Sequence, residues 1–322
     1  MKDFDCALFD VDGCLVDIRK SYNAAIKRSV KFILKNFNSD RRTLVNRRRT
    51  YLVTDKIILK FRQTGGFNND VDTSYVICLA ELAEPHKRIP DARNFLFQVA
   101  SNSSEEGIAS AEKYLATLTS TTRVKNLKRM LGYPAPPGKS ILATIFDELF
   151  YGPNLFKKLH NFDPIYYSGK PLIENDKLII TKATANSLAR RFKGNLAVVS
   201  GRSKLAAEYS LKSIFGYLKP NCSVFLEDEP REFAKPNPYA IIKAMKNMSA
   251  RTALYVGDAS EDLIMVRRAE KKTNLRIAFC GVYGYSSKPL ETKAHLMNNG
   301  ADFVIQGIND LPNMLNNISL KK

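Results

Sequence analysis

Residues 6–13 read CALFDVDG, four apolar residues followed by two aspartates and a glycine. An apolar run that ends in an acidic turn is typical of a buried parallel strand feeding a loop. Ligands of parallel sheets bind at the carboxyl ends of strands, so we expect the Asp10 and Asp12 carboxylates to line such a crevice. One of them can act as a nucleophile or metal ligand while the other transfers protons.

Further buried strands are predicted only after residue 190. The apolar runs lie at 196–200, 223–226, 253–256, 276–280 and 303–305. Between them are helix-like stretches at 203–215, 238–248 and 260–271. Strands that alternate with helices indicate right-handed crossovers and a mostly parallel sheet. The predicted fold class is therefore α/β with a Rossmann-like sheet, whose first strand comes from the N-terminus.

The residues between the first strand and the later ones are predicted to form a separate all-helical domain. Apolar residues recur at helical intervals in five stretches, at 21–37, 51–61, 75–82, 107–118 and 141–150. We expect a catalytic domain made of residues 1–17 and 171–322, with a helical cap of residues 18–170 inserted into it. A chain of 322 residues is long enough for each part to bury its own core.

The net charge of +18 is unevenly distributed, because residues 19–63 hold 14 Lys or Arg and only two acidic residues. Such a stretch attracts phosphate-bearing partners, whether small metabolites or nucleic acid. The simpler interpretation is a solvated helical face rich in Lys and Arg. Nucleic-acid binding would need aromatic residues among the arginines, but only Tyr51 is close to them, so we do not expect it. The arginines concerned are Arg41, Arg42, Arg47, Arg48 and Arg49.

Membrane association and disulfide bonding are not expected either. No apolar run approaches the ~20 residues of a membrane-spanning helix, and acidic residues stand where a signal peptide would be positive. These features predict a cytoplasmic protein. The five cysteines are scattered and form no C-x-x-C pair, so we expect reduced, mostly structural thiols and no zinc site.

Polar residues at three later strand ends are suited to hold a phosphate and a hard cation. The sequence SGR at 200–202 ends the second predicted strand and offers a hydroxyl and backbone N–H groups for an anion. Lys235 follows the third strand, and Asp258 and Asp262 follow the fourth. Each signal is weak alone, but their order at successive strand ends favours one common site.

Four segments in this order resemble the motifs of the haloacid dehalogenase (HAD) superfamily: FDVDGCLVD at 9–17, VVSGR at 198–202, KPNP at 235–238 and YVGDASED at 255–262. The similarity covers the whole predicted catalytic domain. The inserted helices match the branch with a helical cap after the first motif, which is phosphoglycolate phosphatase-like. The resemblance implies a magnesium-dependent phosphohydrolase that cleaves a small phosphomonoester. A phosphomutase would use the same residues, and a basic nucleic-acid-binding protein is the alternative from another class.

The resemblance also implies a role for each aspartate. Asp10 would attack phosphorus and form a phospho-aspartate. Asp12 would protonate the leaving alcohol and then deprotonate the attacking water. Mg²⁺ would be held by the Asp10 carboxylate, the Asp12 backbone carbonyl and Asp258. A second aspartate in the first motif points to phosphate esters, because family members that cleave carbon–halogen bonds lack it.

The other motif residues would hold the phosphate. By resemblance, Ser200 hydrogen-bonds the transferring group and Lys235 offsets its charge. Gly201 and Arg202 are candidate substrate-binding residues. Asp262 would contact the residues that bind the metal without binding it directly. Such positive groups are physically required, since a carboxylate that attacks a phosphate dianion brings like charges together.

One segment of the predicted cap, TGGFNND at 64–70, has two interpretations. Its amides, Asn68 and Asn69, are candidate substrate-binding residues if the loop faces the active site. The loop could equally connect two helices, with Asp70 as the N-cap of the second. The sequence leaves both interpretations open.

Overall fold

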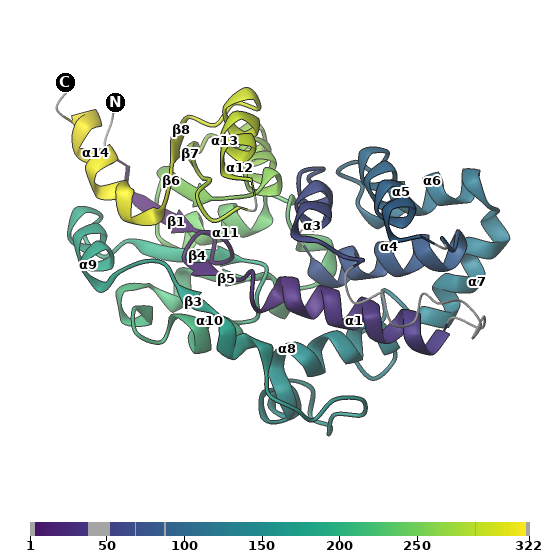
Figure 1. Cartoon of the computed structure of the whole chain (residues 1–322). Helices are drawn as coiled ribbons and strands as arrows, with labels where there is room; N and C mark the ends of the chain where they lie inside the picture. Colours follow the sequence, from purple (N-terminus) through teal and green to yellow (C-terminus); the bar gives the residue numbers. More distant parts are fainter. Residues whose placement is uncertain (1–3, 38–51, 68, 87, 287, 320–322) are drawn as a thin grey trace. The chain divides into compact units, whose positions relative to one another are not determined.

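The computed structural model describes residues 4–37, 52–67, 69–86, 88–286 and 288–319 (Figure 1). The chain divides into two compact units. One consists of Met1–Ile18 and Asp176–Lys322, and the other of Arg19–Asn175. Among the described residues, no helix has the length and apolar character needed to cross a bilayer.

A six-stranded parallel sheet forms the centre of the first unit, in the order β5-β4-β1-β6-β7-β8 (Figure 1). Its strands are β1 (Cys6–Phe9), β4 (Leu196–Ser200), β5 (Val224–Phe225), β6 (Thr252–Gly257), β7 (Arg276–Val282) and β8 (Phe303–Ile305). The predicted α/β class is confirmed, and each predicted apolar run overlaps one of these strands. All four β1 residues are buried, as expected for a central strand covered on both faces.

Strand register brings the motif residues to one edge of this sheet. Phe9, the last residue of β1, pairs with Val198 of β4 and Val256 of β6. The loop that starts at Asp10 therefore leaves the sheet between the ends of two neighbouring strands. Because all of these strands are parallel, their carboxyl ends meet at one edge, which is where such sheets bind ligands.

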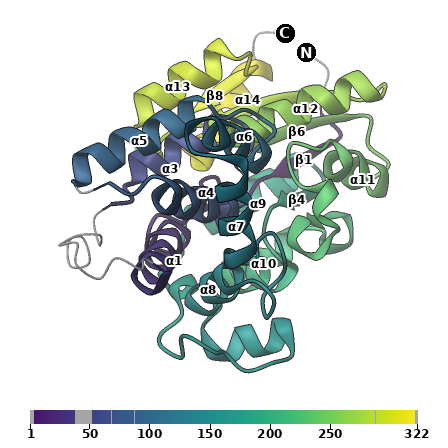
Figure 2. The same cartoon turned by 90° about the vertical axis from the view of Figure 1, so that its right-hand side faces the viewer.

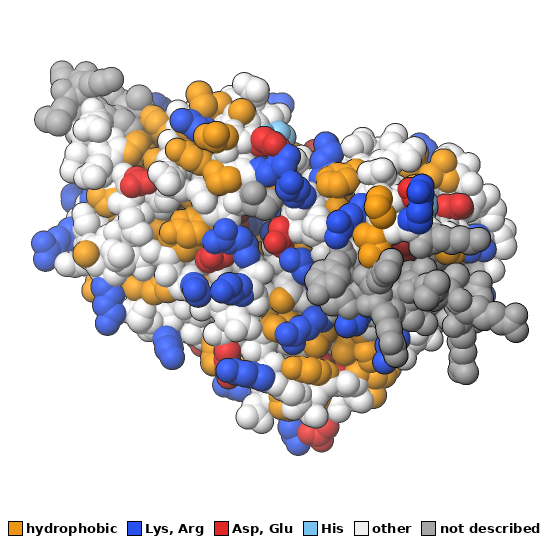
Figure 3. Space-filling model, in the orientation of Figure 1, with side chains coloured by type: hydrophobic (Ala, Val, Ile, Leu, Met, Phe, Trp, Pro, Cys, Tyr) orange, Lys and Arg blue, Asp and Glu red, His pale blue; other side chains and the backbone are white. Residues whose placement is uncertain are grey.

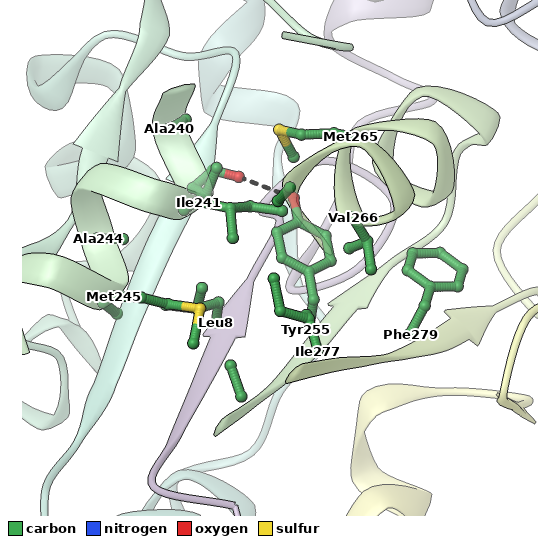
Figure 4. Close-up of a cluster of buried hydrophobic side chains, with 14 of the residues drawn as sticks. Leu8, Ala240, Ile241, Ala244, Met245, Tyr255, Met265, Val266, Ile277 and Phe279 are labelled. Carbon is green, nitrogen blue, oxygen red and sulfur yellow. Dashed lines mark hydrogen bonds between the residues drawn. The ribbon is translucent and has the colours of Figure 1, made fainter. Parts of the chain in front are cut away.

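The helices described in the first unit are α9 (Lys182–Arg191), α10 (Lys204–Leu211), α11 (Tyr239–Asn247), α12 (Ser260–Lys272), α13 (Pro289–Asn298) and α14 (Leu311–Ser319). A buried cluster joins α11 and α12 to one face of the sheet (Figure 4). There Leu8 and Tyr255 meet Ile241 and Met245 of α11 and Met265 of α12. The Tyr255 ring lies in this apolar cluster, yet its hydroxyl is hydrogen-bonded, as a buried phenol requires.

A short antiparallel pair, β2 (Val16–Asp17) with β3 (Lys177–Leu178), joins the two chain segments of this unit. Its strands have only two residues each, too few for an alternating pattern to predict them. It ties the segment after the first motif to the point where the chain returns from the insertion.

All elements described in the second unit are helical: α1 (Tyr22–Phe37), α3 (Asp55–Arg62), α4 (Asp70–Ala83), α5 (Ile89–Ser101), α6 (Ile108–Leu118), α7 (Thr121–Leu131), α8 (Ile141–His160) and the 3₁₀ segment Leu172–Asn175. The expected helical insertion is thus confirmed. In Figure 2, α4 lies among the other helices, and it contacts α1, α5, α6, α7 and α8. That central position explains why nearly all of its residues are buried.

Several helix boundaries differ from the prediction. The helix expected over 51–61 starts only at Asp55, because the Thr54 side chain accepts the Ile57 N–H and caps it. The helix expected over 141–150 continues to His160 across a kink at Gly152, whose φ is 64°, immediately before Pro153.

The basic stretch is described only in part. Its five clustered arginines, from Arg41 to Arg49, lie outside the described residues. In the face shown in Figure 3, the described Lys and Arg side chains of the protein are distributed over the surface and do not form one patch. All five cysteines are described, and each is a free thiol.

Candidate active site

Asp10 is held at the end of β1 by both its backbone and its side chain. Its N–H donates to the Val256 carbonyl oxygen at 2.9 Å. Its Oδ1 accepts the Val11 N–H at 2.8 Å and lies 2.9 Å from Lys235 Nζ. Burial raises the pKa of Asp10, although the Lys235 ammonium acts in the opposite direction. Asp10 is therefore a buried, oriented carboxylate beside a cation.

Lys235 bridges two buried carboxylates. Its Nζ lies 2.9 Å from Asp10 Oδ1 and 2.7 Å from Asp262 Oδ1. Burial disfavours a charge on the ammonium, but the two carboxylates outweigh this effect and raise the pKa of Lys235. The lysine is therefore a permanent positive charge at the end of β1.

Asp262 is held by three groups. It lies beside Lys235, accepts the Tyr255 hydroxyl at 2.8 Å, and accepts the Ala259 N–H at 3.3 Å. Tyr255 was not singled out from the sequence, because its place in an apolar strand predicts only a core residue. These bonds occupy the Asp262 carboxylate, so it can fix the position of Lys235.

Three carboxylates at this edge could hold a metal ion. One oxygen each from Asp10, Asp258 and Asp262 lies within 4.8 Å of the others. Carboxylate oxygens are the donors that Mg²⁺ prefers, so the residues present fit the expected ion. Both Asp262 oxygens already have partners in the protein, whereas the contacts of Asp10 are on Oδ1, so Asp10 and Asp258 are the better placed pair. Gly13 has φ +74°, and a Cβ there would lie 1.9 Å from Asp258 Oδ2, so only glycine leaves room for this carboxylate.

The segment SGR at the end of β4 is arranged differently from the expectation. Ser200 is buried, and its Oγ accepts the Arg202 N–H at 3.2 Å. The Arg202 side chain is fully buried, and it binds Asp12, Asp176 and Ser210. The guanidinium is thus engaged by side chains of the protein itself.

The start of α10, next to this segment, is capped by carboxylates. The Ser203 N–H donates to Glu227 Oε2 at 2.9 Å, and the Lys204 N–H donates to Asp228 Oδ2 at 2.8 Å. Both acceptors belong to a 3₁₀ turn, Leu226–Asp228, directly after β5. These two amides are thus used within the protein. Of the groups expected to bind an anion here, the Ser200 hydroxyl and the Gly201 N–H remain.

The loop at 64–70 has a local structural role. Asn69 is the N-cap of α4, and its Oδ1 accepts the Val71 N–H at 2.8 Å. The expectation that Asp70 would be the N-cap is therefore wrong by one residue. Asp70 is the first residue of the helix, and its carboxylate pairs with Arg62 at 2.7 Å. Asn68 lies outside the described residues.

Replacing Asn69 with alanine should lower the free energy of unfolding by about 1 kcal/mol, because the α4 N-cap is lost. Urea unfolding of wild type and variant measures this difference. Asn69→Asp is the matched control, since aspartate caps equally well and should restore stability. An unchanged midpoint in the alanine variant would contradict the capping role.

Comparison with known proteins places the chain in a family. A family model of haloacid dehalogenase-like hydrolases matches residues 4–270, and the chain belongs to this family. A structure solved by the Northeast Structural Genomics Consortium has a TM-score of 0.61 at 16% identity, and the match covers 100% of both chains. The phosphatase Tt82 from Thermococcus thioreducens has a TM-score of 0.53 at 20% identity, over 92% of this chain and 99% of that one. A search of curated proteins finds no match.

Proposed function

We propose that this protein is a magnesium-dependent phosphohydrolase that cleaves a small phosphomonoester through a phospho-aspartate on Asp10. The supporting observation is the arrangement of Asp10, Lys235 and Asp262, in which a buried carboxylate at a strand end is held beside a buried cation. This arrangement suits attack on a phosphate, because the ammonium offsets the negative charge that gathers around phosphorus.

In the first step, Asp10 attacks phosphorus. The bond between an Asp10 carboxylate oxygen and phosphorus forms while the bond between phosphorus and the leaving oxygen breaks. Both the Val11 N–H and Lys235 contact Oδ1, so we assign the attack to Oδ2. Asp12 donates a proton to the leaving alcohol. A nucleophile that is already oriented avoids the entropic cost of alignment during the reaction.

In the second step, water hydrolyses the acyl phosphate. Asp12 removes a proton from the water as its oxygen bonds to phosphorus, and the bond between phosphorus and Asp10 breaks. Inorganic phosphate leaves and Asp10 is regenerated. Ser200 and the Gly201 N–H are the proposed hydrogen-bond donors to the phosphoryl oxygens, with Lys235 as their counter-charge.

Asp10, the Asp12 backbone carbonyl and Asp258 would hold Mg²⁺, whose charge lowers the repulsion between Asp10 and the phosphate. Asp262 keeps a supporting role, because its carboxylate already fixes Lys235 and the start of α12. Of the three carboxylates grouped at this edge, those of Asp10 and Asp258 are then assigned to the ion.

The test is a screen of purified protein against phosphorylated metabolites, with inorganic phosphate measured. We expect phosphate release with Mg²⁺ and inhibition by Ca²⁺, because the larger ion accepts bidentate carboxylates and would misplace Asp10. Full activity in the presence of a chelator would contradict the metal assignment. Conversion of a sugar phosphate to its isomer without phosphate release would instead indicate a phosphomutase.

A further inference from the structure

The Arg202 guanidinium links three residues within the first unit. Its Nε donates to Asp12 Oδ1 at 2.5 Å. Its Nη1 donates to Asp176 Oδ2 and to Ser210 Oγ, both at 2.7 Å. The Ser210 hydroxyl in turn donates to Asp176 Oδ2 at 2.6 Å. Asp12 and Asp176 thus share one buried cation.

Burial distinguishes the two ends of this network. The side chains of Arg202 and Asp176 are 0% and 5% exposed, whereas that of Asp12 is 24% exposed. Asp176 and Ser210 therefore form the anchored end, and Asp12 is the end that reaches solvent. A guanidinium is planar and its donors are in fixed directions, so anchoring Nη1 also fixes the direction of Nε. The Asp12 carboxylate is then held by a rigid support.

We propose that Arg202 is a positioning residue, which holds the Asp12 carboxylate in place for proton transfer and does not bind the substrate phosphate. The inference rests on the proposed function, since it assigns Asp12 as the proton donor and acceptor. Without the arginine, the Asp12 carboxylate would lose a charged partner that limits its side-chain conformations. The arginine selects one of them before substrate binds.

A double-mutant cycle with p-nitrophenyl phosphate and Mg²⁺ tests this role. Asp12→Asn should reduce kcat by roughly 10² to 10⁴-fold, the usual range for lost acid–base help. Arg202→Met should reduce kcat at least about tenfold without raising KM, because it acts only through Asp12. Adding Arg202→Met to the Asp12→Asn variant should change kcat by less than about twofold.

Two outcomes of the cycle would overturn the proposal. Equal losses from Arg202→Met in both backgrounds would mean that Arg202 acts independently of Asp12. A raised KM with an unchanged kcat would mean that it contacts the substrate. Arg267→Met is the matched control, because Arg267 also pairs with two carboxylates, Glu270 and Asp302, but touches neither Asp10 nor Asp12. It should leave kcat within about twofold.

A second measurement does not depend on activity. Arg202→Met removes the cation paired with the buried Asp176 and can unfold the protein, so Arg202→Lys, which keeps the charge, is crystallised as well. A lysine cannot reach both carboxylates in the fork geometry of arginine. We expect the Asp12 carboxylate to shift while Asp10 and Lys235 stay in place. An unmoved Asp12 would overturn the positioning role, even if the wild type cleaved no phosphoester and the proposed function itself failed.

Discussion

Replacing Asp10 with asparagine is expected to abolish turnover. An amide is a poor nucleophile and a weaker magnesium ligand, so the phospho-enzyme cannot form. Loss of the whole catalytic route corresponds to a fall of at least about 10⁶-fold, to the background rate. The measurement is phosphate release from the best substrate of the screen, at saturating Mg²⁺.

The fold should survive this substitution. The asparagine Oδ1 can accept the same two hydrogen bonds, from the Val11 N–H and Lys235, and Asp262 remains as a counter-charge for the lysine. Circular dichroism and thermal unfolding provide the control. Residual phosphatase activity clearly above background in a folded variant would contradict Asp10 as the nucleophile.

Replacing Lys235 with methionine is expected to have the largest effect on stability. It leaves Asp10 and Asp262, both at most 7% exposed, without their shared cation. Removing one partner of a buried ion pair lowers the free energy of unfolding by roughly 3–5 kcal/mol, because the charge that remains buried has lost its partner. Urea unfolding monitored by circular dichroism measures this loss.

Two further variants make the Lys235 result specific. Lys243→Met removes a lysine that is 38% exposed and pairs with Glu229, and it should cost no more than about 1 kcal/mol. Adding Asp262→Asn to Lys235→Met should recover part of the stability, since one unpaired carboxylate is neutralised. Equal costs for the two lysines would mean that the buried bridge contributes no more than a surface pair.

The sheet could be predicted from the sequence because its strands are mostly apolar. A central parallel strand is buried on both faces, so CALF and LAVVS stand out from their polar surroundings. The helices were harder to predict. Five described helices, α5, α7, α9, α13 and α14, were missed. In α9, for example, Leu188 is the one large apolar side chain in 10 residues, which is too little for a periodic pattern.

The sequence predicts that a residue lies at the site only where that residue follows the end of a parallel strand. Asp10, Lys235 and Asp262 follow strand ends, and parallel strands bring such ends together. Hydrogen-bond partners are not determined in this way. Arg202 and Asp12 are 190 residues apart, and the arginine turns into the core because Asp176 and Ser210 accept its other donors there. No local pattern in the sequence indicates that direction.

Chemical trapping of the phospho-enzyme tests the central claim most directly. Asp12→Asn is mixed with p-nitrophenyl phosphate and Mg²⁺, because this leaving group needs no acid but the second step needs the base, so the intermediate accumulates. Borohydride then reduces the acyl phosphate, and peptide mass spectrometry locates the product. We predict homoserine at position 10. Phosphate release by the wild type without any reduced residue at position 10 in the trapped variant would contradict the phospho-aspartate mechanism.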